Sequence, residues 1–223
     1  MLMEWIRCQS GLWLNFVKTE VSMSLSERQE SERVLRKPAV SINFEKLEEK
    51  HLVTYFSKPE FKQEAYREVL RRYQHVIYRY TRNLLVSSQD AETVTAQTFI
   101  SFWKKLASVK WNAALRFMIY RLASNEVISF LRRNNKSVDF DQAQQEMSKF
   151  LELEQDVNTS LLEVKLQKAL CYLPFKQKLV FVLSYFEGFD FDEIAELTQS
   201  DSRTLESTFQ HAKKKLDIYL GVM

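Results

Sequence analysis

The sequence contains few of the residues that make tight turns, with three glycines and three prolines among 223 residues. Glycine and proline together usually make up roughly 12% of a protein. Sandwiches, barrels and doubly wound folds need many tight turns and glycine-rich loops, so this composition disfavours them. Hydrophobic residues reach 45% and aromatic residues 13% of the chain, which argues against disorder. We therefore expect an all-α fold class, with two small helical domains joined by an acidic linker.

Cysteine, histidine and long apolar runs are also scarce. Cys8 and Cys171 are the two cysteines and form no CxxC pair, which excludes a disulfide framework and a zinc finger. The three histidines lack metal-ligand spacing, so we expect no metal and no cofactor. No apolar run approaches the roughly 20 residues that span a bilayer, and the N-terminus is a poor signal peptide. We expect a cytoplasmic protein.

The net charge of the chain is small, at +3, but the charged residues are unevenly distributed. Residues 58–133 carry 14 basic and 6 acidic groups, for a net +8. Residues 134–160 carry 2 basic and 6 acidic groups, for a net −4, and residues 161–223 carry 8 and 9, for a net −1. A compact segment at +8 is typical of a surface that binds a polyanion, although a merely soluble basic surface has the same signature.

The composition along the chain predicts four parts. Residues 1–50 form an N-terminal extension whose function we leave unassigned, with Met23 as a second candidate for the initiating methionine. A helical domain follows at residues 51–135, an acidic linker at 136–160 and a second helical domain at 161–223. A polar, acidic stretch between two amphipathic regions favours a linker between folded units.

Apolar residues at three- or four-residue spacing predict three long helices in the first domain. They begin near Ser57, near Ser88 or Asp90, and near Asn112, and the last ends near residue 133. Ser57 and Glu60 have the spacing of a capping box at the start of the first helix. The short segment before the third helix contains Trp111.

The second domain has the pattern of a helix-turn-helix. A helix runs from the break at Pro174 to Phe186, and Gly188 then stands where glycine commonly follows a helix. Asp190 begins a short helix with Glu193 three residues on, as in a capping box. After a turn at residues 199–201, Ser202 begins the final helix, which reaches about residue 219. A short helix, a tight turn and a longer helix form the helix-turn-helix arrangement.

The last helix has two distinct faces at about 100° per residue. Its core stripe consists of Leu205, Phe209, Ala212 and Leu216. The opposite face carries short polar and basic groups, namely Arg203, Thr204, Ser207, Gln210, His211 and Lys214. Such groups reach base edges and phosphates in a major groove, but an ordinary solvated helix face has the same composition.

Four sequence blocks together resemble one family. Residues 90–103, DAETVTAQTFISFW, are similar to the D-A-E-D-x-x-Q-E-x-F-x-x-x-W block of bacterial extracytoplasmic-function (ECF) sigma factors. Residues 119–125 with residues 131–133 are similar to its L-Y-x-I-A-R-N…L-R-R block. In the second domain Leu173-Pro174, residues 181–183, Glu187-Gly188 and residues 192–197 follow the family spacing, and residues 204–207 stand where T-V-K-S is usual. The resemblance covers about 130 of the 223 residues.

The resemblance implies a division of labour. The first domain is then a sigma region 2-like domain that binds the core of bacterial RNA polymerase and the minus-ten element of promoter DNA, and the second is a sigma region 4-like domain. The implied polymerase-binding set is Asp90, Gln97, Thr98, Phe99, Phe102 and Trp103, of which we expect at least one aromatic ring to lie in the core. The implied DNA-binding set in the first domain is Lys110, Trp111, Asn112, Arg116, Arg121, Asn125, Arg132 and Arg133. Trp111 either stacks on an unpaired base or covers the helical bundle.

Some positions depart from the family pattern. Ser124 and Ser129 replace an arginine and an aspartate in the third helix. Glu206, Thr208 and His211 replace residues that are usually basic in the recognition helix, which predicts a weak or altered contact with the minus-thirty-five element.

The sequence therefore predicts a sigma factor that directs transcription initiation, possessing no enzymatic activity of its own and with an anti-sigma factor as a further possible partner. Two alternatives remain open. One is a sigma-like module that binds polymerase or an anti-sigma factor without initiating transcription, and the other is a general helix-turn-helix regulator. The absence of a nucleotide-binding loop or a nucleophile–base pair argues against an enzyme.

Overall fold

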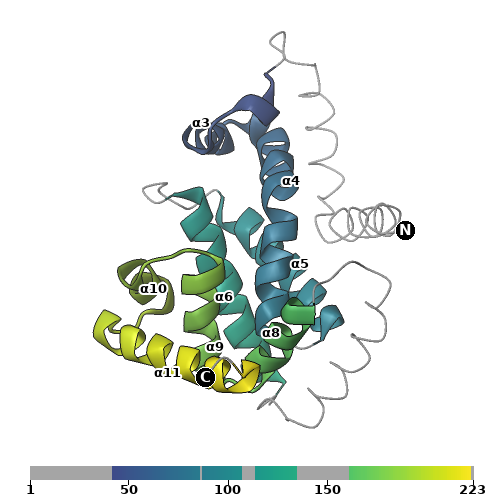
Figure 1. The fold of residues 1–223 in the computed structure, drawn as a ribbon. Helices are drawn as coiled ribbons and strands as arrows, with labels where there is room; N and C mark the ends of the chain where they lie inside the picture. The colour runs from purple at the N-terminus through teal and green to yellow at the C-terminus, as the bar shows by residue number, and fades with distance from the viewer. Residues whose placement is uncertain (1–41, 86, 107–113, 135–160, 222–223) are drawn as a thin grey trace. The chain divides into compact units, whose positions relative to one another are not determined.

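The computed structural model describes residues 42–85, 87–106, 114–134 and 161–221, and all regular elements within these ranges are helical (Figure 1). Backbone packing divides the chain into two compact units. The first is Met1–Arg71 with Phe99–Leu115, and the second is Arg72–Thr98 with Arg116–Met223. The all-α fold class is confirmed. The domain limits expected at residues 50, 135 and 160 stay a prediction.

Three short helical segments open the described part of the first unit. They are η1 (Phe44–Lys46), α3 (Glu49–Thr54) and η2 (Tyr55–Ser57). Asn43 caps η1 by accepting a hydrogen bond from the Glu45 backbone N–H. Much of residues 42–57 is therefore folded, and these helical segments precede the first long helix expected near Ser57.

Aromatic rings join these segments to the longer helices α4 (Pro59–Leu84) and α5 (Ser88–Lys105). Phe61 lies 6.2 Å from Phe44 and 5.5 Å from Tyr55, between ring centroids. Phe56 packs edge-on against Phe102 at 5.9 Å. Edge-on aromatic pairs are stabilising beyond the area they bury.

In the second unit, the later part of α4, the first part of α5 and helix α6 (Leu115–Arg133) share a core that contains buried hydroxyl groups. The Thr81 and Thr95 hydroxyls are 2.9 Å apart. The Tyr80 hydroxyl lies 2.7 Å from the Ser124 hydroxyl. Because buried polar groups are costly unless they are hydrogen-bonded, these pairs fix how α4 faces its two neighbours.

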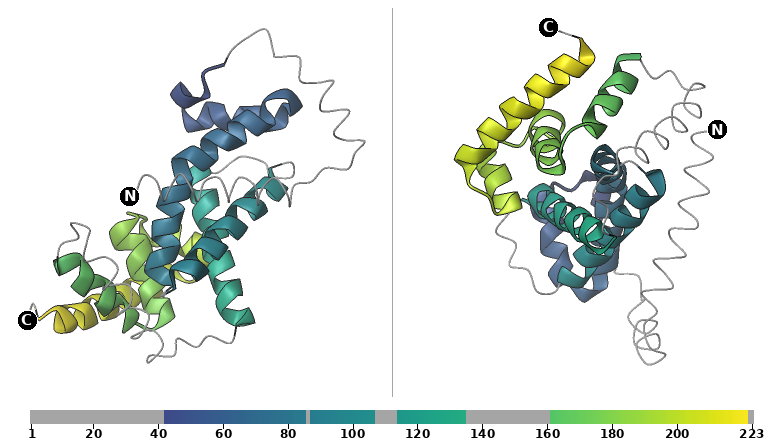
Figure 2. Two further views of the ribbon diagram at one scale, coloured as in Figure 1. Left: turned by 90° about the vertical axis from the view of Figure 1, so that its right-hand side faces the viewer. Right: turned by 90° about the horizontal axis from the view of Figure 1, so that it is seen from below.

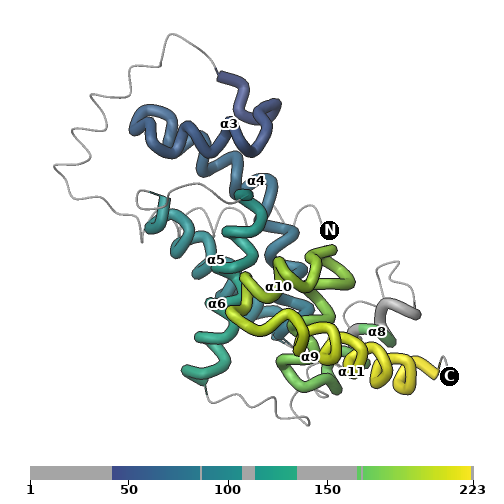
Figure 3. Tube along the Cα trace, turned by 90° about the vertical axis from the view of Figure 1, so that its left-hand side faces the viewer, coloured from purple at the N-terminus to yellow at the C-terminus, as the bar shows by residue number. Residues whose placement is uncertain are grey.

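The same unit continues through α8 (Leu161–Cys171), α9 (Phe175–Phe181), the π-helical turn η3 (Val182–Phe186), α10 (Phe191–Thr198) and α11 (Ser202–Leu220). Helix α11 packs against α9, α8 and α10 (Figure 2). Its buried side chains are Leu205, Ala212 and Leu216, whereas Phe209 is half-buried. Helices α10 and α11 with the tight connection between them form the predicted helix-turn-helix (Figure 3).

The capping box predicted at the start of α10 and the glycine predicted before it are confirmed. Asp190 accepts a hydrogen bond from the Glu193 backbone N–H at 2.8 Å, and the Glu193 carboxylate accepts one from the Asp190 backbone N–H at 3.0 Å. Gly188 has a φ of 69°, a left-handed conformation that glycine adopts without steric cost. Gln199 ends α10 at a φ of 53°.

Two local predictions differ from the structure. The first long helix begins at Pro59, and the Ser57 hydroxyl donates a hydrogen bond to the Thr54 carbonyl. Proline is favoured at the first helical position, so the helix begins two residues beyond the serine. The helix expected to run to Phe186 changes to the wider π-helical turn at Val182.

Candidate nucleic-acid and protein interface

The α5 block expected to contact polymerase contains both surface and core residues. Asp90, Gln97 and Trp103 are half-exposed, whereas Thr98 and Phe99 are fully buried and Phe102 is 1% exposed. Phe99 and Phe102 lie in the core, as expected for at least one of the aromatic rings, and Thr98 is also buried. Polymerase binding by this set of residues stays a prediction.

Trp103 is held by two neighbours on α4. Its ring lies 4.8 Å from that of Tyr66, and the Lys62 ammonium lies 4.7 Å from its centroid. The Tyr66 hydroxyl also donates a hydrogen bond to the Phe99 carbonyl at 2.9 Å. Because Lys62 sits over the ring, Trp103 offers a mixed cationic and aromatic surface.

Helix α6 presents four of the eight predicted DNA-binding residues of the first domain to solvent. Arg121, Asn125, Arg132 and Arg133 are exposed. Lys110, Trp111 and Asn112 lie outside the described residues, so the stacking role of Trp111 stays a prediction. The exposed α6 residues leave three arginines able to meet phosphates.

Arg116 has a different environment from the other α6 arginines. It is half-buried, its guanidinium donates a hydrogen bond to the Glu187 carbonyl, and it lies 4.1 Å from the centroid of the Phe189 ring. The Tyr120 hydroxyl donates to the Glu187 carboxylate. Sequence reasoning missed this cluster: Tyr120 and Glu187 both stand in family blocks, but no local pattern links them.

The electrostatics of Glu187 follow from this setting. Burial raises the pKa of its carboxyl group above the ordinary value, while the Tyr120 hydrogen bond and the charges of Arg79 and Arg116 act in the opposite direction. Burial also raises the pKa of Tyr120, so its hydroxyl remains a donor at neutral pH. Burial is the largest of these effects, so the charged form of Glu187 is disfavoured on balance.

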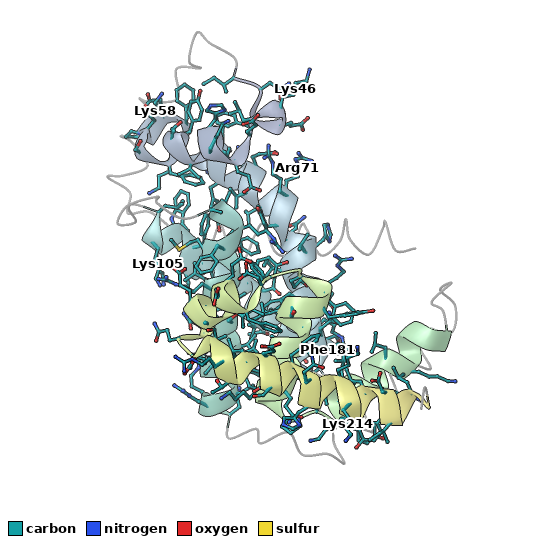
Figure 4. The ribbon with its side chains drawn as sticks, turned by 60° about the vertical axis from the view of Figure 1, so that its left-hand side comes forward. Lys46, Lys58, Arg71, Lys105, Phe181 and Lys214 are labelled. Atoms are coloured by element: carbon teal, nitrogen blue, oxygen red, sulfur yellow. The ribbon has the colours of Figure 1, made fainter. Side chains whose placement is uncertain are left out.

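The outer face of α11 is solvent-exposed as expected. Arg203, Thr204, Ser207, Gln210, His211 and Lys214 are all exposed, and Lys214 can be followed in Figure 4. The Thr204 hydroxyl donates to the Asp201 carbonyl and the Ser207 hydroxyl to the Thr204 carbonyl, at 2.8 and 3.0 Å. The face therefore combines free cations and amides with hydroxyls that are already engaged in local bonds.

Within the described ranges, no cluster of three or more His, Cys, Asp or Glu side chains is placed to hold a metal ion. Among the helices that the structure describes, none combines the length and apolar character needed to cross a membrane.

Comparison with known proteins identifies the two halves. The Sigma-70 region 2 family model matches residues 69–137, and the Sigma-70, region 4 model matches residues 163–216. The chain belongs to the sigma-70 family of RNA polymerase sigma factors, in its ECF group. Proteins of this family bind RNA polymerase core and direct it to promoter DNA, and this chain is a sigma factor of that kind.

Its relatives are distant. The sigma factor is 24% identical over 143 residues to RNA polymerase sigma factor SigV of Bacillus subtilis, covering 64% of this chain and 83% of that protein. It is 25% identical to ECF RNA polymerase sigma factor SigE of Mycolicibacterium smegmatis, covering 69% of this chain and 61% of that protein. Its fold is similar to that of the sigma factor RpoE of Bartonella quintana, solved with the anti-sigma factor NepR, with a TM-score of 0.56 at 20% identity over 73% of this chain and 98% of that one.

Proposed function

We propose that this sigma factor divides its work between its two family regions, with region 2 supplying most of the affinity for polymerase and promoter DNA. The observation that carries the proposal is the exposure of Arg121, Arg132 and Arg133 on α6 within a segment of net charge +8. Cations that neutralise phosphates release counterions, and this supplies much of the free energy of binding to DNA.

In this proposal α5 contacts the polymerase core through the side chains that remain accessible. Gln97 and Trp103 are half-exposed on α5, whereas Phe99 and Phe102 are buried. Aromatic residues are enriched at protein interfaces. Asp90, in the first turn of α5, is also half-exposed.

Helix α6 then holds the opened strand of the minus-ten element, with Asn125 reading base edges and the arginines holding phosphates. Region 4 contributes a weaker contact through the outer face of α11. Asp192, Glu193 and Glu196 on α10 are exposed, and they add negative charge beside the recognition helix. Carboxylates repel a phosphate backbone, so the minus-thirty-five contact contributes little affinity.

The protein is proposed to act in the cytoplasm and to carry out no chemical step itself, since the polymerase performs RNA synthesis. An anti-sigma factor is a proposed regulator, as for the fold relative solved with NepR. The proposed domain limits are those of the sequence analysis, with the acidic linker at residues 136–160 between regions 2 and 4.

Transcription by purified core polymerase on genomic fragments tests the proposal, with and without this protein. New transcripts with discrete start sites are expected only when both are present. Capture of core polymerase without any new transcript would favour the alternative of a binding module that cannot initiate.

A further inference from the structure

The segments η1, α3 and η2 and the first turn of α4 keep more of their apolar surface outside a core than the rest of the first unit does. Six of the eight apolar side chains between residues 42 and 61 are half-buried, whereas Leu52 and Phe56 are buried. Further along α4, Ala65 and Val69 are completely buried. Within the described residues, the N-terminal end of the first unit therefore lacks one layer of packing.

Three of the half-buried side chains form an aromatic patch, which consists of Phe44, Tyr55 and Phe61. The ring centroids of Phe44 and Tyr55 lie 5.3 Å apart, and those of Tyr55 and Phe61 lie 5.5 Å apart. The ammonium of Lys58, which is labelled in Figure 4, lies 4.8 Å from the centroid of the Tyr55 ring. The rings come from η1, η2 and α4, so an occupant of the aromatic patch would contact three elements of the first unit.

The charges around the aromatic patch nearly balance. Residues 42–61 contain three lysines and four glutamates, and Lys50 pairs with Glu48 at 2.7 Å. A surface without excess positive charge does not attract nucleic acid, because that attraction depends on cations that neutralise phosphates. The half-buried rings favour an apolar occupant instead, since covering them removes more apolar surface from water.

The chain itself contains a segment of matching chemistry, at residues 2–17. Nine of these sixteen residues are large and apolar, among them Trp5, Trp13 and Phe16, and two are charged. Residues 18–41 connect this segment to the described chain, and 24 residues span at most roughly 80 Å. A tethered segment has an effective concentration on the order of millimolar, which gives it an advantage over an untethered partner.

We propose that residues 2–17 dock on the aromatic patch and supply the layer of packing that the described part of the first unit lacks. The N-terminal extension is then a structural part of this unit, and a chain that begins at Met23 lacks that part. Aromatic side chains that pack on the three rings form pairs that are stabilising beyond the area they bury. The inference is independent of the proposed function, because it concerns how the first unit folds.

The distance between the segment and the aromatic patch tests the proposal in the full-length protein. With Cys171 replaced by serine, Cys8 carries one spin label, and Glu60→Cys, at an exposed position in the first turn of α4, carries the other. An undocked chain from Cys8 to Ile42, about 34 residues, would give a broad distance distribution centred near 30 Å. We expect a single narrow peak at a shorter distance.

The first variant changes the segment and leaves the described core intact. Trp13→Ser combined with Phe16→Ser removes two apolar side chains from residues 2–17. Val34→Ser combined with Leu35→Ser is the matched control, because it removes an apolar pair that lies outside the segment. We expect the narrow peak to be lost in the first pair and kept in the control. Hydrogen exchange of the α3 amides should be severalfold faster in the first pair than in the control, because the cover over α3 is lost.

The second variant changes the aromatic patch. Tyr55→Ser removes the ring that joins Phe44 to Phe61, and Tyr172→Ser, which removes a half-buried ring from the second unit, is its control. We expect the narrow peak to be lost in Tyr55→Ser and kept in Tyr172→Ser. Because Tyr55→Ser also removes contacts within the described chain, the variant of the segment decides where the two disagree.

Other occupants give different results. A broad distribution in the protein that carries only the labels would overturn the proposal, as would equal effects of the segment variant and its control. A narrow peak between molecules, when protein labelled at Cys8 alone is mixed with protein labelled at Glu60→Cys alone, would assign the aromatic patch to a second copy. A broad distribution together with sedimentation on vesicles of phosphatidylcholine and phosphatidylglycerol would assign residues 2–17 to a lipid surface. Either assignment would also overturn the proposal.

Discussion

Neighbouring residues of the family block on α5 serve different purposes. Phe99 and Phe102 are buried, while Gln97, two positions before Phe99, keeps part of its amide surface exposed. The block therefore builds a core with some residues and offers a surface with others. A surface change is the better probe of partner binding, because it leaves the core intact.

Gln97→Ala is expected to leave the melting temperature within about 2 °C of wild type and to weaken capture of core polymerase severalfold. The matched control is Gln89→Ala, an exposed glutamine in the first turn of the same helix. Pull-down with tagged core polymerase measures capture, and circular dichroism measures melting. Undiminished capture by Gln97→Ala would remove this face of α5 from the proposed interface.

Glu187 predicts a pH dependence of stability. Burial raises the pKa of its carboxyl group, so the folded protein holds the proton more tightly than the unfolded chain does. This contribution of Glu187 is fully favourable below its ordinary pKa and is lost as the pH rises through the raised value.

The variant Glu187→Gln tests this pH dependence, because its amide side chain cannot ionise. The melting temperature of wild type relative to this variant should fall as the pH rises across that window, and thermal melts between pH 4 and about pH 8 measure it. If the difference in melting temperature stays constant with pH, or grows in favour of wild type as the pH rises, the pKa of Glu187 is not raised in the folded protein.

At the scale of elements, α10 depends on its cap because it is a short helix of eight residues. The Asp190 side chain and the Glu193 side chain each accept a backbone N–H at the helix start. Asp190→Ala should destabilise the protein by about 1 kcal/mol in chemical denaturation. Asp192→Ala, at an exposed position in the first turn, is the control and should cost less than half as much; equal losses would mean that the box does not stabilise α10.

Sequence patterns predicted the elements whose signals are local. Asp190 caps α10, and Gly188 follows the preceding helical turn in a left-handed conformation, as predicted. Helix α11 begins at Ser202, as predicted, with Asp201 as its N-cap. No capping residue marks the π-helical turn that begins at Val182, so the sequence pattern did not predict it. Phe181, which is labelled in Figure 4, stacks on Tyr185 and Phe209 at 5.1 and 5.6 Å between centroids.

The candidate site was predictable only in part, for the same reason. Helical periodicity was enough to predict that Gln210 and Lys214 are exposed and that Leu205 is buried. It did not predict that Arg116 and Tyr120 meet Glu187, because 67 or more residues separate the partners in sequence. Long-range pairing depends on tertiary packing, which periodicity does not encode.

At the scale of the whole molecule, the charge partition predicts where the salt dependence of promoter binding originates. Each phosphate contact changes the slope of log K against log salt by about −0.9 on duplex and about −0.7 on single strands. Replacing Arg132 and Arg133 by Ala should therefore flatten the slope by roughly one to two units. Both side chains are exposed in the last turn of α6.

The comparison variant replaces Lys213, Lys214 and Lys215 by Ala, which removes more charge from an exposed part of α11. Binding titrations across a series of salt concentrations measure both slopes. The triple variant is expected to change the slope less than the arginine pair does. A larger change would place the main electrostatic contact in region 4.

As a sigma factor, this chain is expected to make RNA polymerase core open promoter DNA. Permanganate oxidises unstacked thymines, so it can be applied to a genomic fragment that yields a transcript with this protein. We predict reactive thymines just upstream of the start site when core polymerase and the sigma factor are both present, and their loss when Arg132 and Arg133 are replaced by Ala. Unreactive thymines in a complex that contains both proteins and the DNA would contradict the account.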